Sequence, residues 1–155
     1  MKYLFLLFFA FSLYGQNILG RVDQFDLPEL SLYDIKAKID TGAKTSSVDC
    51  FEIIPLKNNY VKFRVIDSNE SKSYKYITKP VSRVSNVKSS NGKSQRRYFI
   101  YTTIVIYDMT YKLELSLSSR KNMKYPLLIG RELLKQGFIV DVSKENLSYK
   151  SKKSY

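Results

Sequence analysis

Residues 35–43 read IKAKIDTGA, and the last four letters spell the motif Asp40-Thr41-Gly42-Ala43. The apolar residues before the motif alternate with lysines, a period of two that is typical of a half-buried β-strand. This strand delivers the Asp40 carboxylate to a tight loop, where Gly42 permits close backbone approach and the Thr41 hydroxyl can hydrogen-bond within the loop. Such a loop suits acid–base chemistry, although an ordinary Asp-Gly turn is the competing interpretation of the three letters alone.

A second informative stretch lies at residues 126–134, which read PLLIGRELL. Its apolar run predicts a buried strand that ends at Gly130. The residues Arg131–Gln136 predict a short helix. Gly137 is suited to end that helix before a further strand over Phe138–Val142.

The remaining sequence predicts a mainly β fold in one domain. The chain has 155 residues, of which 44% are hydrophobic, and its apolar runs are short and rich in Ile, Val, Tyr and Phe. Further strands are expected at residues 18–22, 48–56, 61–66, 74–78, 98–107 and 113–117. The turn-like residues 57–59 predict a hairpin, and the polar tail is expected to fray beyond Tyr149.

The polar stretch Ser82–Arg97 contains Ser89-Ser90-Asn91-Gly92, in which Asn-Gly is a strong signal for a tight turn. This stretch is our candidate for a flap that closes over a substrate, and an ordinary solvent-exposed loop is the alternative. Its basic side chains would suit a substrate that carries carboxylates. They are Lys88, Lys93, Arg96 and Arg97.

Residue types that are missing restrict the chemistry. The sequence contains no His and a single Cys, Cys50, so neither a His-based zinc site nor a Ser-His-Asp triad can form. We therefore expect no metal and no cofactor, and we interpret Cys50 as a small buried hydrophobic residue. Carboxylate chemistry is what remains.

The first residues predict export. A short basic start, Met1-Lys2-Tyr3, precedes an apolar run over Leu4–Leu13 that is too short to span a bilayer comfortably. We expect a signal peptide over residues 1–15, a folded domain over 16–149, a basic tail over 150–155, and a periplasmic or secreted product without a stable membrane span. A buried N-terminal strand or an uncleaved anchor is the alternative.

The chain is strongly basic. It has 26 Lys and Arg against 14 Asp and Glu, a formal charge of +12. No helix-turn-helix or RNA-binding signature accompanies this charge, so we expect a solvated basic surface and no nucleic-acid partner. A nucleic-acid or envelope-surface binder would rest on the net charge alone.

Five motifs in a fixed order resemble the bacterial retropepsin-like aspartic peptidase family that has been labelled an ATP-dependent zinc protease. They are Ile18–Arg21, Asp40–Ser46, Ser89–Gly92, Arg97-Tyr98 and Pro126–Arg131. The resemblance covers residues 18–142 and implies a single-lobe acid-protease fold, a closed β-barrel with one short C-terminal helix, in which the Asp-Thr-Gly loop lies near Gly130. The zinc and ATP of the family label find no support, because the sequence has neither a His-based metal site nor a P-loop.

The same resemblance implies roles for individual residues. Asp40, Thr41 and Gly42 would be catalytic. The implied substrate-binding residues are Ala43, Ser89, Ser90, Asn91, Gly92 and Arg97, and the implied structural neighbours of the site are Ile129, Gly130 and Arg131. Viral relatives carry an acidic residue where this chain has Lys44, so Arg131 needs a different partner here.

The number of Asp-Thr-Gly motifs in the chain determines where a second catalytic carboxylate would come from. The sequence contains one Asp-Thr-Gly and no internal repeat, so a second carboxylate must come from a second copy in a two-fold homodimer. The expected activity is that of an aspartic-type endopeptidase or amidase on a peptide or protein substrate. Acidic or glutamyl-rich peptides are expected substrates because relatives of the family are associated with ligases that append glutamates. The alternative is a noncatalytic exported binding module that keeps the barrel.

Overall fold

A computed structural model describes residues 17–66, 73–88, 92, 94–120 and 123–154 of the chain. The leader predicted over residues 1–15 lies outside these ranges. The described residues form the mainly β fold that the sequence predicts, with two short α-helices and one turn of 3-10 helix. None of the helices in these ranges is long and apolar enough to cross a lipid bilayer.

The strands follow one another closely along the chain. They are β1 (Asn17–Leu27), β2 (Leu32–Ile39), β3 (Ser46–Asp49), β4 (Phe51–Pro55), β5 (Tyr60–Ile66), β6 (Tyr74–Pro80), β7 (Arg83–Lys88), β8 (Ser94–Ile106), β9 (Met109–Ser118), β10 (Leu127–Ile129) and β11 (Phe138–Glu145). The helices are η1 (Pro28–Leu30), α1 (Arg131–Leu134) and α2 (Leu147–Lys153).

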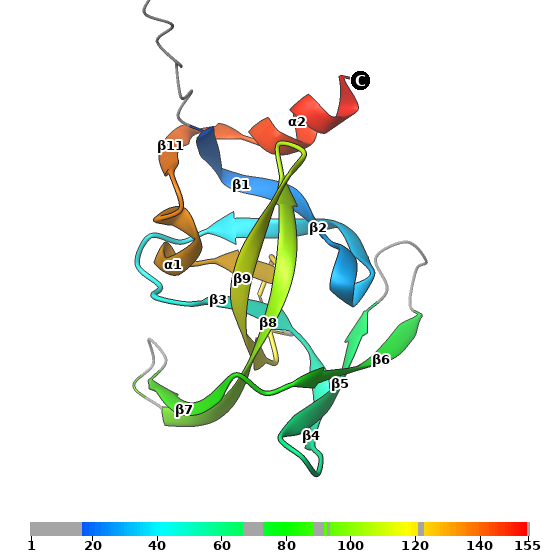
Figure 1. Cartoon of the computed structure of the whole chain (residues 1–155). Helices are drawn as coiled ribbons and strands as arrows, with labels where there is room; N and C mark the ends of the chain where they lie inside the picture. The colour runs from blue at the N-terminus through cyan, green and yellow to red at the C-terminus, as the bar shows by residue number, and fades with distance from the viewer. Residues whose placement is uncertain (1–16, 67–72, 89–91, 93, 121–122, 155) are drawn as a thin grey trace, which may run out of the picture.

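The strands form one large and one small sheet (Figure 1). The large sheet runs in the order β11-β1-β2-β10-β3-β9-β8-β7, and β4, β5 and β6 form the small one. A residue pair between Asp26 and Val105 also joins β1 to β8, so the large sheet closes on itself as a ring. β4 and β5 pair antiparallel across residues 57–59, which confirms the predicted hairpin.

One apolar cluster connects the two sheets. Alternate residues of β9 and β5 lie in it, and each of them is at most 2% exposed: Leu113, Leu115, Leu117, Val61, Phe63 and Val65. This is the period of two that a half-buried strand requires. The small sheet therefore shares its core with the ring.

The strand predicted over residues 48–56 is divided at Cys50. β3 ends just before this residue in the large sheet, and β4 begins just after it in the small sheet. The Cys50 N–H donates to the Ser118 carbonyl at 3.1 Å, which fixes the crossing point. Sequence pattern cannot reveal such a change of sheet, because both halves of the stretch are equally compatible with a strand.

The polar stretch Ser82–Arg97 forms most of a hairpin. β7 pairs antiparallel with β8 from Arg83–Phe99 to Lys88–Ser94, and Gly92 between the strands has a φ of +82°, which glycine adopts readily. Polar residues are tolerated here because β7 is an edge strand in which no residue is buried. The predicted turn residues Ser89, Ser90 and Asn91 lie outside the described ranges.

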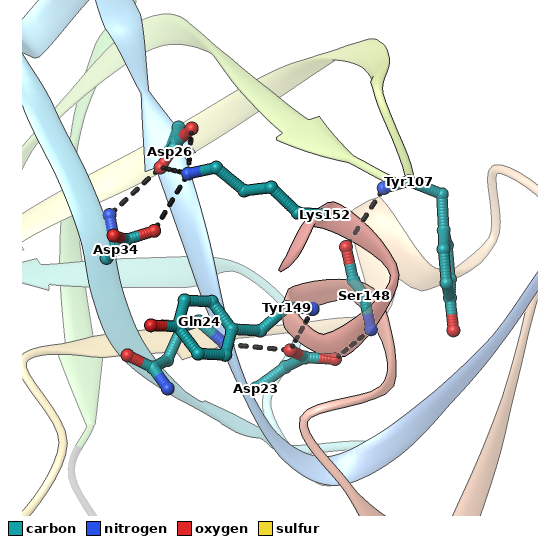
Figure 2. Close-up of polar contacts among 8 residues, drawn as sticks. All are labelled: Asp23, Gln24, Asp26, Asp34, Tyr107, Ser148, Tyr149 and Lys152. Carbon is teal, nitrogen blue, oxygen red and sulfur yellow. Dashed lines mark hydrogen bonds and ion pairs between the residues drawn. The ribbon is translucent and has the colours of Figure 1, made fainter. Parts of the chain in front are cut away.

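The prediction that the tail frays beyond Tyr149 is wrong, because α2 continues to Lys153 and is held by a buried carboxylate of β1 (Figure 2). Asp23 is 1% exposed and accepts hydrogen bonds from the backbone N–H groups of Ser148 at 3.0 Å and Tyr149 at 3.1 Å. These are N–H groups of the first helical turn, which have no partner within a helix. A cap supplied from another element cannot be seen in the helix sequence itself.

A second contact fastens the far end of α2. The Lys152 ammonium donates to the carboxylates of Asp26 and Asp34, each at 2.8 Å (Figure 2). Burial alone would lower the pKa of Lys152, but the hydrogen bonds and charges of the two carboxylates outweigh it and raise the pKa. The helix thus links the first strand of the ring to the C-terminus.

We expect Asp23→Ala to lower the free energy of unfolding by about 2 to 4 kcal/mol, since it leaves two N–H groups of α2 without an acceptor in a buried place. Urea denaturation followed by circular dichroism measures this. Asp141→Ala is the control, because the Asp141 carboxylate bonds only locally, to Ser143 and Lys144. Equal denaturation midpoints for the two variants would contradict the role assigned to Asp23.

Candidate active site

The loop after β2 is held in place by β10 and the start of α1. β10 lies between β2 and β3, parallel to the first and antiparallel to the second. The Asp40 N–H donates to the Ile129 carbonyl at 2.9 Å, and the Arg131 N–H donates to the Ala43 carbonyl at 2.9 Å. The predicted proximity of Asp40 to Gly130 is therefore confirmed.

Gly130 is the point of closest approach between the two stretches. A Cβ atom at this position would lie 2.7 Å from the carbonyl carbon of Thr45 and 2.9 Å from the Lys44 carbonyl oxygen. The Gly130 N–H donates to the Ser46 hydroxyl at 3.0 Å. The site requires glycine here because the backbone of the Asp40 loop occupies the space of a side chain.

The Asp40 carboxylate is oriented by its own loop. Its Oδ1 accepts hydrogen bonds from the Gly42 N–H at 3.0 Å and the Ala43 N–H at 3.3 Å. Within the described residues, the hydrogen bonds to this carboxylate all end at Oδ1. Asp40 is only partly buried, so a carboxylate of fixed orientation faces an accessible space.

Arg131 binds the loop in a way that the sequence does not predict. Its Nη1 donates to the Thr41 carbonyl at 2.9 Å and to the Gly42 carbonyl at 3.1 Å. These two carbonyls take the place of the acidic partner found in viral relatives. Lys44 is exposed and need not contribute to the binding of this arginine.

A cleft of about 660 Å³ lies between the Asp40 loop and the β7–β8 hairpin, which Figure 1 shows on the same side of the molecule. Its described lining includes the carboxylate of Asp40 as the only acidic group and several basic side chains. The basic residues are Lys44, Arg83, Lys88, Arg97 and Arg120. A cleft with this charge balance attracts anionic groups.

Two of these arginines are partly desolvated. Burial lowers the pKa of Arg97 and of Arg120 from their ordinary values. Arg120 is held by the Ser47 hydroxyl at 3.0 Å and the Tyr125 carbonyl at 3.1 Å, whereas Arg97 Nε is buried without a hydrogen-bond partner among the described residues. An anion bound in the cleft would offset this cost of burial.

Ser89, Ser90 and Asn91 lie outside the described residues, and the structure places the other predicted site residues in three groups. Asp40, Gly42, Ala43 and Arg97 line the cleft. Thr41, Ile129, Gly130 and Arg131 support the loop through backbone contacts, and Gly92 lies in the exposed end of the hairpin. Sequence reasoning did not single out Arg83 or Arg120, which belong to no motif. Arg83 lies within the predicted flap and reaches the cleft on the paired strand β7, and Arg120 is directed to it by the Ser47 hydroxyl.

Two kinds of chemistry other than that of carboxylates would depend on a set of metal ligands or on a reactive thiol. No group of three His, Cys, Asp or Glu side chains suited to hold a metal ion occurs in the ranges that the structure describes. Cys50 is buried, and its burial, together with the charge of Asp49, raises the pKa of the thiol to about 12. Cys50 is therefore a protonated core residue at neutral pH, as its isolation in the sequence suggests.

Comparison with known proteins agrees with the motifs. Residues 18–151 match the model of a family described as RimB-like, the retropepsin-like aspartic endopeptidase RimB. A curated protein of Shewanella pealeana named "Probable alpha-L-glutamate ligase" is 36% identical over 132 residues, and one of the same name from Desulfotalea psychrophila is 31% identical over 146 residues. These matches cover 81% and 86% of this chain, but only 28% and 32% of the two ligases.

A solved structure supports the fold. The crystal structure of a Legionella pneumophila protein of unknown function superimposes with a TM-score of 0.71 and 24% sequence identity. The match covers 86% of this chain and 99% of that one. At this level of identity the similarity concerns the fold alone.

Proposed function

Because this chain belongs to the retropepsin-like aspartic endopeptidase family, we propose that it is an aspartic-type endopeptidase or amidase whose Asp40 works with the Asp40 of a second copy. The observation that carries this proposal is the Asp40 carboxylate, held through Oδ1 at the edge of a cleft large enough for a peptide. We further propose that the closed ring of strands is the single-lobe barrel expected of such a peptidase.

The proposed mechanism uses two carboxylates that share one proton. Two carboxyl groups in hydrogen-bonding contact cannot both be ionised, because their negative charges repel each other. The ionised carboxylate takes a proton from water, whose oxygen bonds to the carbonyl carbon of the substrate. The protonated carboxylate gives its proton to the carbonyl oxygen. When the resulting tetrahedral intermediate collapses, the C–N bond breaks, the amine leaves with the proton held by one carboxylate, and a hydroxyl of the intermediate returns a proton to the other carboxylate, which restores the shared proton.

A two-fold homodimer is the proposed source of the second carboxylate. Thr41 and Gly42 at the tip of the loop are exposed, so another copy of the loop can approach them. Around a two-fold axis each loop would meet its own equivalent, which brings the two Asp40 side chains together.

We propose acidic, glutamyl-rich peptides as the substrate class. The cleft pairs one carboxylate with five basic side chains, and two of the arginines are partly buried. The relatives named as probable α-L-glutamate ligases contain a region similar to this chain in a longer polypeptide. A peptidase that recognises glutamyl chains would act on the kind of product that the name of these relatives describes.

We expect a glutamate-rich peptide to be cleaved with a kcat/KM at least about tenfold above that of the same peptide with glutamines, since each carboxylate gains charge-assisted hydrogen bonds that an amide cannot make. The preference should shrink as salt is raised. The measurement is mass spectrometry of the products at low and high salt, with EDTA present to remove metal-dependent contaminants.

Two outcomes would count against these proposals separately. Equal cleavage of the glutamate and glutamine peptides would refute the recognition of carboxylates and leave the peptidase intact. No cleavage of these peptides or of a broad peptide library by the concentrated protein would refute the peptidase function itself.

A further inference from the structure

Glu114 of β9 accepts hydrogen bonds from the two residues at the base of the β7–β8 hairpin, Ser82 and Arg83. Its Oε1 accepts from the Ser82 hydroxyl at 2.9 Å and from Arg83 Nε at 3.1 Å, while its Oε2 accepts from Arg83 Nη2 at 2.9 Å. The Glu114 side chain is only 18% exposed. This is a two-pronged arginine–carboxylate pair, the arrangement that fixes side-chain direction most strongly.

The same arginine reaches two other parts of the site. Its Nη2 lies 3.5 Å from the hydroxyl of Thr45, in the segment that packs on Gly130. Its guanidinium carbon lies 3.5 Å from the ring centroid of Phe99, on the opposite strand of the hairpin. Arg83 therefore touches both strands of the hairpin and the continuation of the Asp40 loop.

Arg83 also stands between two hollows of the surface. It lines the Asp40 cleft and a neighbouring hollow of about 750 Å³ that α1 and β9 help to form. Glu114 lines the second hollow but does not belong to the lining of the first. The Glu114 side chain therefore does not contact a ligand beside Asp40, and its structural effect on such a ligand passes through Arg83 and the hairpin.

We infer that Glu114 is a positioning residue, which sets the place of Arg83 and of the hairpin base relative to Asp40 and thereby controls the affinity for substrate. The expected effect on substrate affinity rests on the proposed peptidase function. The role of Glu114 in anchoring the hairpin does not depend on that function. Ser82 makes two contacts at the base of the hairpin. Its hydroxyl donates to Glu114, and its N–H donates to the Phe99 carbonyl at 2.8 Å.

The test is Glu114→Gln, which keeps the size of the side chain and removes its charge. We expect KM for the glutamate-rich peptide to rise about tenfold with kcat changed less than about twofold, because only the charge-assisted part of the pair is lost. Amide hydrogen exchange at Ser82 should become about tenfold faster, while exchange in β5 stays unchanged.

Glu145→Gln is the control, since it removes the carboxylate of a different, exposed ion pair, with Arg21, and neither residue lines the cleft. It should leave KM and exchange at Ser82 unchanged. The Arg83→Gln variant completes a double-mutant cycle, in which Glu114→Gln should add little once Arg83 is gone.

Three results would overturn the inference: unchanged exchange at Ser82 in Glu114→Gln, an equal fall of kcat and kcat/KM, or full additivity of the two substitutions. If the unsubstituted protein proves inactive, the proposed function fails, and the exchange data still decide whether Glu114 anchors the hairpin.

Discussion

Asp40→Asn is expected to lower kcat on the order of 10³-fold while the fold survives, because the amide can neither accept the proton of water nor share a proton with its symmetry mate. Asparagine is of similar size, and its side-chain oxygen can still accept from the Gly42 and Ala43 N–H groups. The change thus removes the acid and base without removing the interactions that shape the loop. The measurement is single-turnover cleavage of the glutamate-rich peptide, with the urea midpoint as a check on folding.

The concentration dependence of the unsubstituted protein tests the source of the second carboxylate. If each site needs two chains, the specific activity must fall on dilution through the dimer dissociation constant. Asp141→Asn, on β11, is the matched control and should behave like the unsubstituted protein, because Asp141 does not line the cleft. A noncatalytic binding module would bind the peptide equally well with Asn at position 40 and show no cleavage at any concentration, whereas equal cleavage by Asp40→Asn would refute the role of Asp40.

Gly130→Ala is expected to lower the free energy of unfolding by about 3 kcal/mol and to abolish most activity, since overpacking against backbone atoms cannot be relieved by a change of rotamer. The added methyl group would lie 2.7 Å from the carbonyl carbon of Thr45, so the Asp40 loop must move away from β10. That movement would disturb the N–H of Asp40 and its bond to Ile129. Urea denaturation and peptide cleavage measure the two effects.

Gly137→Ala separates this clash from the general cost of replacing glycine. Gly137 has a φ of +105°, where a side chain is strained, but no atom lies within 4 Å of the position of its Cβ. We expect a loss of about 1 kcal/mol and nearly full activity from this variant. Equal effects at the two positions would mean that the close approach at Gly130 does not matter.

The Asp40 loop could be predicted well from the sequence, because the pattern that specifies it lies within a few neighbouring residues. The alternation before Asp40 and the apolar run before Gly130 each specify a strand within a few residues, and the family resemblance brings the two together. The side chains around this pair were less predictable. The sequence predicts that Arg131 needs a new partner but does not identify it. The partners are the backbone carbonyls of Thr41 and Gly42, and because every residue has a backbone carbonyl, no residue type marks such an acceptor.

The C-terminal end of the chain shows the opposite case. Residues 147–153 are polar and lack a side-chain cap of their own, and so read as a fraying tail. Their helix depends on Asp23, which lies 125 residues earlier than its partner Ser148. Arg120 was missed for a related reason, because its loop carries no motif and is directed to the cleft by Ser47 of β3.

The position of β10 between β2 and β3 also determines when the site can exist during synthesis. Asp40 leaves the ribosome well before Arg131, which lies 90 residues after Thr41, the residue whose carbonyl it binds. Contacts of such long sequence separation form late in folding. A nascent chain therefore carries the aspartate before the framework that holds its loop in place, and the loop is fixed beside β10 only after residues 127–131 have been made.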